Sequence, residues 1–113
     1  MQFASDVWGD FMTEPTKHTV LFMSSTYKGV ETIQQVHAMG CYVLLMIEEE
    51  LRDEAWPWES IDETFFTPNL ARYQDVINTV SYLCRGRQID YIVPLDEFEV
   101  ELVAMLREHL RLP

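Results

Sequence analysis

The chain has 113 residues, of which 48% are hydrophobic and 24% charged, and its formal net charge is −11. This length is typical of one domain, and the apolar content is that of a globular protein rather than a disordered one. The acidic balance excludes nucleic acid and anionic membrane surfaces as expected partners, because both attract basic surfaces. No apolar run approaches the roughly 20 residues of a membrane span, and no secretory signal opens the chain, so we expect a cytoplasmic protein.

The cysteines and histidines predict no metal centre. Cys41 and Cys84 are far apart, and no CxxC pair is present. His18, His37 and His109 also lack the spacing of metal ligands. We therefore expect two buried, reduced cysteines, and a His37 packed at the margin of the core.

After a lead-in segment over residues 1–17, the pattern becomes regular and predicts a single domain over residues 18–113. Short apolar runs indicate strands, and apolar residues spaced three or four apart indicate helices. The predicted strands cover His18–Met23, Cys41–Ile47, Asp62–Thr67 and Asp90–Pro94, and the predicted helices cover Lys28–Met39, Leu70–Cys84 and the residues after Asp96.

The connection between the second and third strands is strongly acidic, which is typical of a solvated surface. It contains Trp56-Pro57-Trp58, where Pro57 prevents a regular helix and the two tryptophans are expected to cover the sheet edge. Strands that alternate with helices favour parallel pairing with right-handed crossovers. The sequence therefore predicts an α/β fold, a Rossmann-like open parallel sheet of about four strands with helices on both faces.

In such sheets, ligands bind beyond the carboxyl ends of the strands, where the strand order reverses. If the first and fourth strands are neighbours there, the loop that follows the first strand lines this crevice with Ser24, Ser25, Thr26 and Lys28. Hydroxyls and a lysine before a helix can hold a phosphate or a carboxylate. The alternative, that Ser25 or Thr26 only caps the helix, has about equal weight. Neither a dinucleotide fingerprint nor a P-loop is present.

The loop after the fourth strand carries Asp96 and Glu97. Asp96 is a good N-cap for the last helix, and Glu99, three residues later, completes a capping-box spacing. Capping leaves Glu97 unexplained, and a carboxylate at this position can bind a substrate amine. The residues alone favour capping over catalysis, and no catalytic triad can be assembled.

The stretch Ile89–Pro113 resembles the end of the N-terminal (pre-ATP-grasp) domain of ATP-grasp ligases, in the carboxylate–amine branch related to biotin carboxylase. There, an "IVP-x-(D/E)E" strand end leads into a helix that finishes in "hL-x-LP"; this chain has IVPLDE and HLRLP. The opening strand and the helix start Lys28-Gly29-Val30-Glu31 extend the likeness loosely from His18 to Pro113.

The resemblance implies a domain that packs against a downstream ATP-grasp fold and supplies part of a small-molecule substrate pocket. Glu97, or Asp96, would face the substrate, and Ser24, Ser25 and Thr26 would line the same crevice. The full enzyme would join a carboxylate to an amine or thiol through an acyl-phosphate. ATP and Mg²⁺ would belong to the later fold, so we expect no cofactor, no metal and no catalytic residue in this chain, and no activity from it alone. An apolar surface left without its partner would favour homo-oligomers.

Two other classes remain open. One is a free-standing flavodoxin-like or receiver-like binding module, although Met23-Ser24 stands where a receiver carries its phosphorylated aspartate. The other is a structural subunit that docks through the Trp56–Trp58 segment or an apolar face.

Overall fold

The computed structural model describes residues 17–113, so the predicted lead-in, except Lys17, lies outside the described residues. Within them, every predicted strand and helix is present, with ends that shift by up to three residues. The strands are β1 (Thr19–Ser24), β2 (Tyr42–Glu48), β3 (Glu63–Thr67) and β4 (Tyr91–Pro94). The helices are α2 (Val30–Ala38), α3 (Tyr73–Leu83) and α4 (Val100–Leu110). Three short 3₁₀ turns are η1 (Glu49–Leu51), η2 (Trp58–Ser60) and η3 (Glu97–Glu99).

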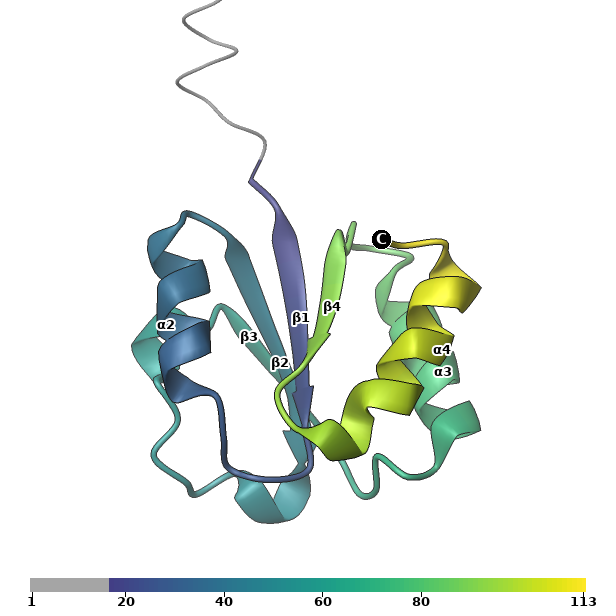
Figure 1. Cartoon of the computed structure of the whole chain (residues 1–113), viewed down its shortest axis with the longest axis horizontal. Helices are drawn as coiled ribbons and strands as arrows, with labels where there is room; N and C mark the ends of the chain where they lie inside the picture. Colours follow the sequence, from purple (N-terminus) through teal and green to yellow (C-terminus); the bar gives the residue numbers. More distant parts are fainter. Residues whose placement is uncertain (1–16) are drawn as a thin grey trace, which may run out of the picture.

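The four strands form one parallel sheet in the order β3-β2-β1-β4. Helix α2 covers one face, and α3 and α4 cover the other (Figure 1). This is the predicted Rossmann-like open sheet. The strand order reverses between β1 and β4, because β2 and β3 extend the sheet to one side of β1 and β4 returns to the other.

Alternate residues of β1 and β2 point into two separate cores, because successive side chains of a strand face opposite ways. Leu21, Met23, Leu44 and Met46 are buried under α3 and α4, whereas Val20, Phe22, Val43, Leu45 and Ile47 are buried on the α2 face. Burial on both faces explains the continuous apolar runs that predicted these strands.

The acidic connection covers the α2 face of the sheet rather than its edge. Trp56 is only 3% exposed in this core, and its indole Nε1 donates to the Leu51 carbonyl at 3.0 Å. Trp58 is 42% exposed. The expectation of a tryptophan pair over the edge was therefore wrong, since only one ring is buried and it lies over a face.

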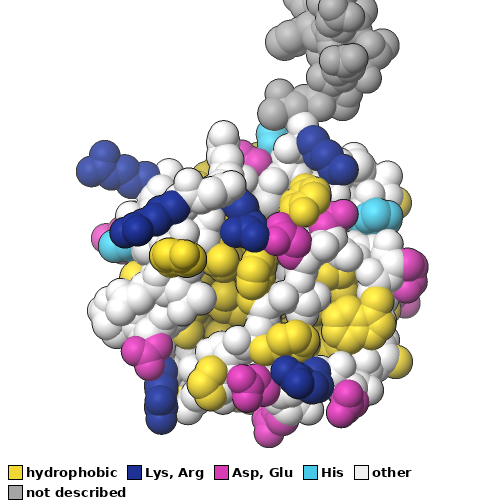
Figure 2. Space-filling view, turned by 180° about the vertical axis from the view of Figure 1, so that it is seen from behind, with side chains coloured by type: hydrophobic (Ala, Val, Ile, Leu, Met, Phe, Trp, Pro, Cys, Tyr) yellow, Lys and Arg dark blue, Asp and Glu magenta, His cyan; other side chains and the backbone are white. Residues whose placement is uncertain are grey.

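The edge strand β3 is covered instead by arginines. The guanidinium of Arg52 lies 4.6 Å from the Phe66 ring centroid, and that of Arg87 lies 5.3 Å from the Phe65 centroid. Neighbouring strand residues face opposite ways, so the two rings lie on opposite faces of the edge. Charged groups here discourage pairing with another strand. Other apolar side chains reach the surface among charged ones, as the view from behind shows (Figure 2).

Two local expectations, on His37 and on the cysteines, are corrected by the structure. His37 is exposed, and Ile33 is the only residue of α2 that is fully buried, so the core does not extend along the helix as far as His37. Cys41 and Cys84 are half-buried rather than buried.

In the part of the chain that is described, no helix is both long enough and apolar enough to cross a membrane.

Candidate functional site

The loops after β1 and β4 meet beyond the carboxyl ends of these neighbouring strands. The Leu95 N–H donates to the Met23 carbonyl at 3.0 Å, which continues the ladder past β4. The Thr26 hydroxyl then donates to a carboxylate oxygen of Asp96 through a short hydrogen bond. The structure therefore brings together two loops that are 70 residues apart in the sequence.

Asp96 is the centre of this contact. It is 5% exposed and caps η3 by accepting from the Phe98 N–H at 3.1 Å, which agrees with the predicted capping role. Lys28 Nζ lies 3.8 Å from its Oδ2. The Thr26 hydroxyl, the Phe98 N–H and the Lys28 charge hold the pKa of Asp96 below its ordinary value, against the opposing effect of burial. Asp96 is thus an ionised, fully engaged carboxylate that ties the loops together.

The β1 loop is shaped by its own hydroxyls. Ser24 is fully buried, and its Oγ donates to the Thr26 carbonyl at 2.6 Å while accepting from the Thr26 N–H at 3.2 Å. Helix α2 begins after Gly29 and has no side-chain cap, so the alternative that Ser25 or Thr26 caps this helix was wrong. These side chains serve the crevice loop and not the helix end.

Gly29 brings the two loops into close contact. Its φ is +82°, and a Cβ at this position would lie 2.5 Å from Leu95 Cδ2 in the other loop. Only glycine adopts this backbone readily and leaves room for Leu95. The Lys28-Gly29 pair that marked the start of the helix in the sequence is therefore also part of the crevice wall.

Glu97 and Ser25 lie apart from this closed network. Glu97 is exposed at the start of η3, so its carboxylate is accessible from solvent at the crevice. Ser25 is half-buried and contributes hydrogen bonds to Glu99, not to Asp96. Among the five residues predicted for the site, Ser24, Thr26 and Asp96 form one bonded cluster, whereas Ser25 and Glu97 do not join it.

Glu99 is the residue that the sequence analysis assigned only to capping. It is 2% exposed, and its Oε2 has no hydrogen-bond partner among the described residues. Burial raises the pKa of Glu99, and the nearby Asp96 charge adds to this while Ser25 opposes it. A signal was present: Glu99 precedes the buried Leu102, Val103 and Leu106 at helical spacing, so it lies on the apolar side of α4.

Glu99 borders a cavity of about 100 Å³ at the carboxyl ends of the strands. The cavity lies between the end of β2, the segment leading into α3 and the η3 turn. Its lining residues are Ser25, Glu48, Leu70, Ala71, Tyr73, Phe98 and Glu99.

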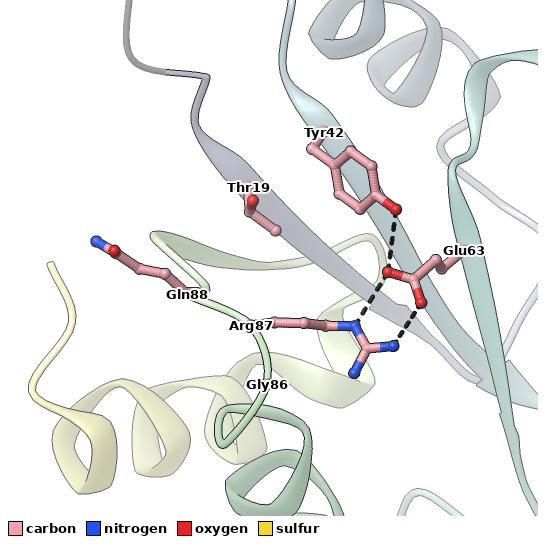
Figure 3. A pocket seen from close by; sticks show the side chains of 6 residues that line it. All are labelled: Thr19, Tyr42, Glu63, Gly86, Arg87 and Gln88. Carbon is pink, nitrogen blue, oxygen red and sulfur yellow. Dashed lines mark hydrogen bonds and ion pairs between the residues drawn. The ribbon is translucent and has the colours of Figure 1, made fainter.

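A larger hollow, of about 440 Å³, lies at the opposite, amino ends of the strands (Figure 3). There, Arg87 donates to both oxygens of Glu63, at 3.0 and 2.6 Å, and the Tyr42 hydroxyl donates to Glu63 at 3.2 Å. Arg87 lowers the pKa of Glu63, and Glu63 raises that of Arg87. The charges satisfy each other and fasten β3 to the segment after α3, so we assign this hollow a structural role.

Within residues 17–113, no group of three or more His, Cys, Asp or Glu side chains is arranged to hold a metal ion. Among the described residues at the strand carboxyl ends, the exposed carboxylate of Glu97 and the polar side chains that line the cavity beside Glu99 are groups that a ligand could contact. Their chemistry suits a cationic or hydrogen-bonding ligand.

No protein-family model matches the sequence, and no curated protein matches it. Among solved structures, the chain is similar to the L-amino acid ligase from Bacillus licheniformis, with a TM-score of 0.71 and 14% sequence identity. The match covers 86% of this chain and 23% of the ligase chain, so the chain spans about a quarter of that protein's length. This likeness shows that the chain has the fold of one segment of a ligase.

Proposed function

We propose that the chain is the N-terminal, substrate-side domain of an ATP-grasp ligase that joins a carboxylate to an amine or thiol through an acyl-phosphate. The observation that carries the proposal is the fold, which is shared with a segment of an amino acid ligase over 86% of this chain. The stretch Asp90–Pro113, which resembles the end of the pre-ATP-grasp domain, supports it independently. This stretch contains β4, η3 and α4, and so forms one wall of the crevice.

In this proposal, the chain positions a small-molecule substrate and does not carry out the phosphoryl transfer. Glu97 supplies an exposed carboxylate toward the substrate. Asp96, Ser24 and Thr26 hold the loop that presents it, since their polar groups are already bonded to one another. ATP and Mg²⁺ bind to the ATP-grasp fold of the complete enzyme.

The test compares the 113-residue chain alone with the same chain joined to the protein segment encoded downstream of Pro113. We expect no Mg²⁺-dependent ATP turnover above background from the chain alone. The longer protein should form ADP only when a carboxylate and an amine or thiol are both present. ATP turnover by the isolated chain, or a downstream segment without an ATP-grasp fold, would contradict the proposal.

A pair of variants separates substrate positioning from a structural effect. Glu97→Gln in the longer protein should raise the KM of the substrate that Glu97 contacts about tenfold, because a hydrogen-bonded charge is lost. The KM of ATP should not change. Glu101→Gln removes another exposed carboxylate, which lies on α4, and serves as the control. Equal effects of both variants would show that Glu97 has no specific role.

A further inference from the structure

Tyr27 belongs to the loop after β1, and the proposed function gives it no role. It directly follows Thr26, whose hydroxyl bonds to Asp96 across the crevice. The Tyr27 side chain instead contacts the connection between β2 and β3, where its hydroxyl donates to the Ala55 carbonyl at 2.7 Å. Its ring meets the Trp56 ring edge-on, with the centroids 5.0 Å apart and the planes at 84°. The hydroxyl and the ring therefore each join the crevice loop to this connection.

The connection offers Tyr27 a fixed point. Trp56 is 3% exposed, and its indole Nε1 donates to the Leu51 carbonyl at 3.0 Å. The indole packs in the core on the α2 face together with Ile33. Edge-to-face aromatic pairs add to the energy of simple burial and favour one relative orientation of the two rings. The loop after β1 is thus held on two sides, by Tyr27 on the connection and by Thr26 on the loop after β4.

Glu97 is linked to Tyr27 through a short series of bonded residues. Thr26 donates to Oδ2 of Asp96, and Oδ1 of the same carboxylate accepts from the Phe98 N–H at 3.1 Å. Glu97 is the residue between Asp96 and Phe98, so this hydrogen bond spans it. A displacement of Tyr27 therefore moves Thr26 against Asp96, and Asp96 carries the displacement to the turn that holds Glu97.

The hydrogen bond of the Tyr27 hydroxyl lies at the surface, which limits its contribution to the stability of the fold. Tyr27 is 39% exposed, so water can replace the phenol as the donor to the Ala55 carbonyl. Loss of the hydroxyl should therefore leave the core intact. It should change how firmly the crevice loop is placed, because the loop then keeps only the ring contact with Trp56 on this side.

We infer that Tyr27 is a positioning residue that fixes the Glu97 carboxylate relative to the substrate by acting through Thr26 and Asp96. The inference deepens the proposed function and rests on it for one point, that Glu97 faces a ligase substrate. The coupling between Tyr27 and Glu97 lies within the 113-residue chain and requires neither ATP nor a second domain. It makes the connection between β2 and β3 a supporting part of the site.

The first test measures this coupling by amide NMR of the ¹⁵N-labelled 113-residue chain. Tyr27→Phe removes only the hydroxyl and keeps the ring, so ring-current effects stay nearly constant. We expect shifted amide signals at Thr26 and also at Glu97, which lies 70 residues further along the chain. The buried Leu45 of β2 should keep its signal, which checks the fold. An unchanged signal at Glu97, or an equally large shift at Leu45, would overturn the inference.

The route through Thr26 is tested with a second variant. In a chain that carries Thr26→Val, which lacks the donor to Asp96, addition of Tyr27→Phe should no longer shift the Glu97 signal. Tyr82→Phe is the matched control, since it removes the hydroxyl of a tyrosine that is 69% exposed on α3. It should leave the Glu97 signal in place. A Glu97 shift that persists without the Thr26 hydroxyl, or that Tyr82→Phe reproduces, would overturn the inference.

The second test measures substrate binding by the chain joined to its downstream segment. Tyr27→Phe should raise the KM of the substrate that Glu97 contacts about threefold, because one neutral hydrogen bond is lost away from the substrate. The kcat and the KM of ATP should not change. With Glu97→Gln already present, Tyr27→Phe should have no further effect on this KM. Additive effects of the two changes would overturn the inference, because a purely structural role of Tyr27 predicts them.

The outcomes separate this inference from the proposed function. If the longer protein has no ligase activity, the proposed function fails, whereas a Glu97 signal that responds to Tyr27 through Thr26 would still establish the coupling. A working ligase in which Tyr27→Phe raises the KM regardless of Glu97 would overturn the role of Tyr27 alone.

Discussion

Gly29 is the residue at which the two crevice loops touch. Gly29→Ala places a Cβ 2.5 Å from Leu95 Cδ2 on a backbone with a φ of +82°, so both strain and a clash follow. We expect a loss of about 1–3 kcal/mol in the free energy of unfolding. This corresponds to a fall of several degrees in the melting temperature, measured by circular dichroism.

Gly86→Ala is the matched control for this change, because a Cβ there has nothing within 4 Å. Its melting temperature should stay close to that of the parent. If both variants lose stability equally, the contact between Gly29 and Leu95 does not hold the crevice loops together.

The hydrogen bond from Thr26 to Asp96 predicts a pH-dependent loss of stability. In the folded state, the pKa of Asp96 lies below its ordinary value of 3.8, chiefly because of Thr26. The stabilisation that ionised Asp96 contributes is therefore fully present above the pKa that Asp96 has in the unfolded chain. It is lost as the pH falls through the lower pKa that Asp96 has in the folded state. Thr26→Val should cost about 1–2 kcal/mol at pH 7 and less below about pH 4.

Urea unfolding of this variant at pH 7 and at pH 3 measures the difference. Thr79→Val is the control, because the Thr79 hydroxyl donates to the Asp75 carbonyl of its own exposed helix turn. It should change stability by less than about 0.5 kcal/mol at either pH. A loss by Thr26→Val that is independent of pH would contradict the link to Asp96.

The residues also show where sequence reasoning reached its limit. The capping role of Asp96 was correct, because it depends on local spacing along the chain. The burial of Glu99 was not predicted, although its helical spacing to later apolar residues placed it on the apolar side of α4. The loop after β1 and the segment before α3 complete its surroundings, and only the folded chain places them nearby. The same is true of Gly29, whose neighbour Leu95 is 66 residues away.

At the scale of elements, the connection between β2 and β3 acts as part of the core. Trp56→Phe removes the indole donor to the Leu51 carbonyl and leaves a gap on the α2 face. We expect a loss of about 1–3 kcal/mol, measured by chemical unfolding. Trp58→Phe, at a ring that is 42% exposed, should stay within about 0.5 kcal/mol of the parent.

Equal losses of stability in the two tryptophan variants would mean that the connection has no buried anchor.

The acidic composition of this segment predicted a solvated surface, and its exposed side chains agree. Composition could not assign different roles to two tryptophans separated by one proline, because that depends on which ring meets Ile33 and the sheet.

At the scale of the whole molecule, the two cores share the strands β1 and β2. We therefore expect one cooperative unfolding transition. The indole N–H signal of Trp56 reports on the α2 face, and the methyl signals of Met23 and Met46 report on the α3–α4 face. In urea, these NMR signals should disappear with the same midpoint; separate midpoints would show that the faces unfold independently.

The sequence by itself determined the order of the elements and the parallel α/β class. Periodicity and apolar runs are local properties, and alternation of strands with helices leaves few arrangements. The tertiary structure decided what meets at the carboxyl ends of the strands. Pairing of β1 with β4 brings Thr26 against Asp96, and packing of η3 beside β2 and α3 encloses Glu99 with Glu48. These contacts span 51 to 70 residues along the chain, so they arise from the sheet order and not from any local pattern.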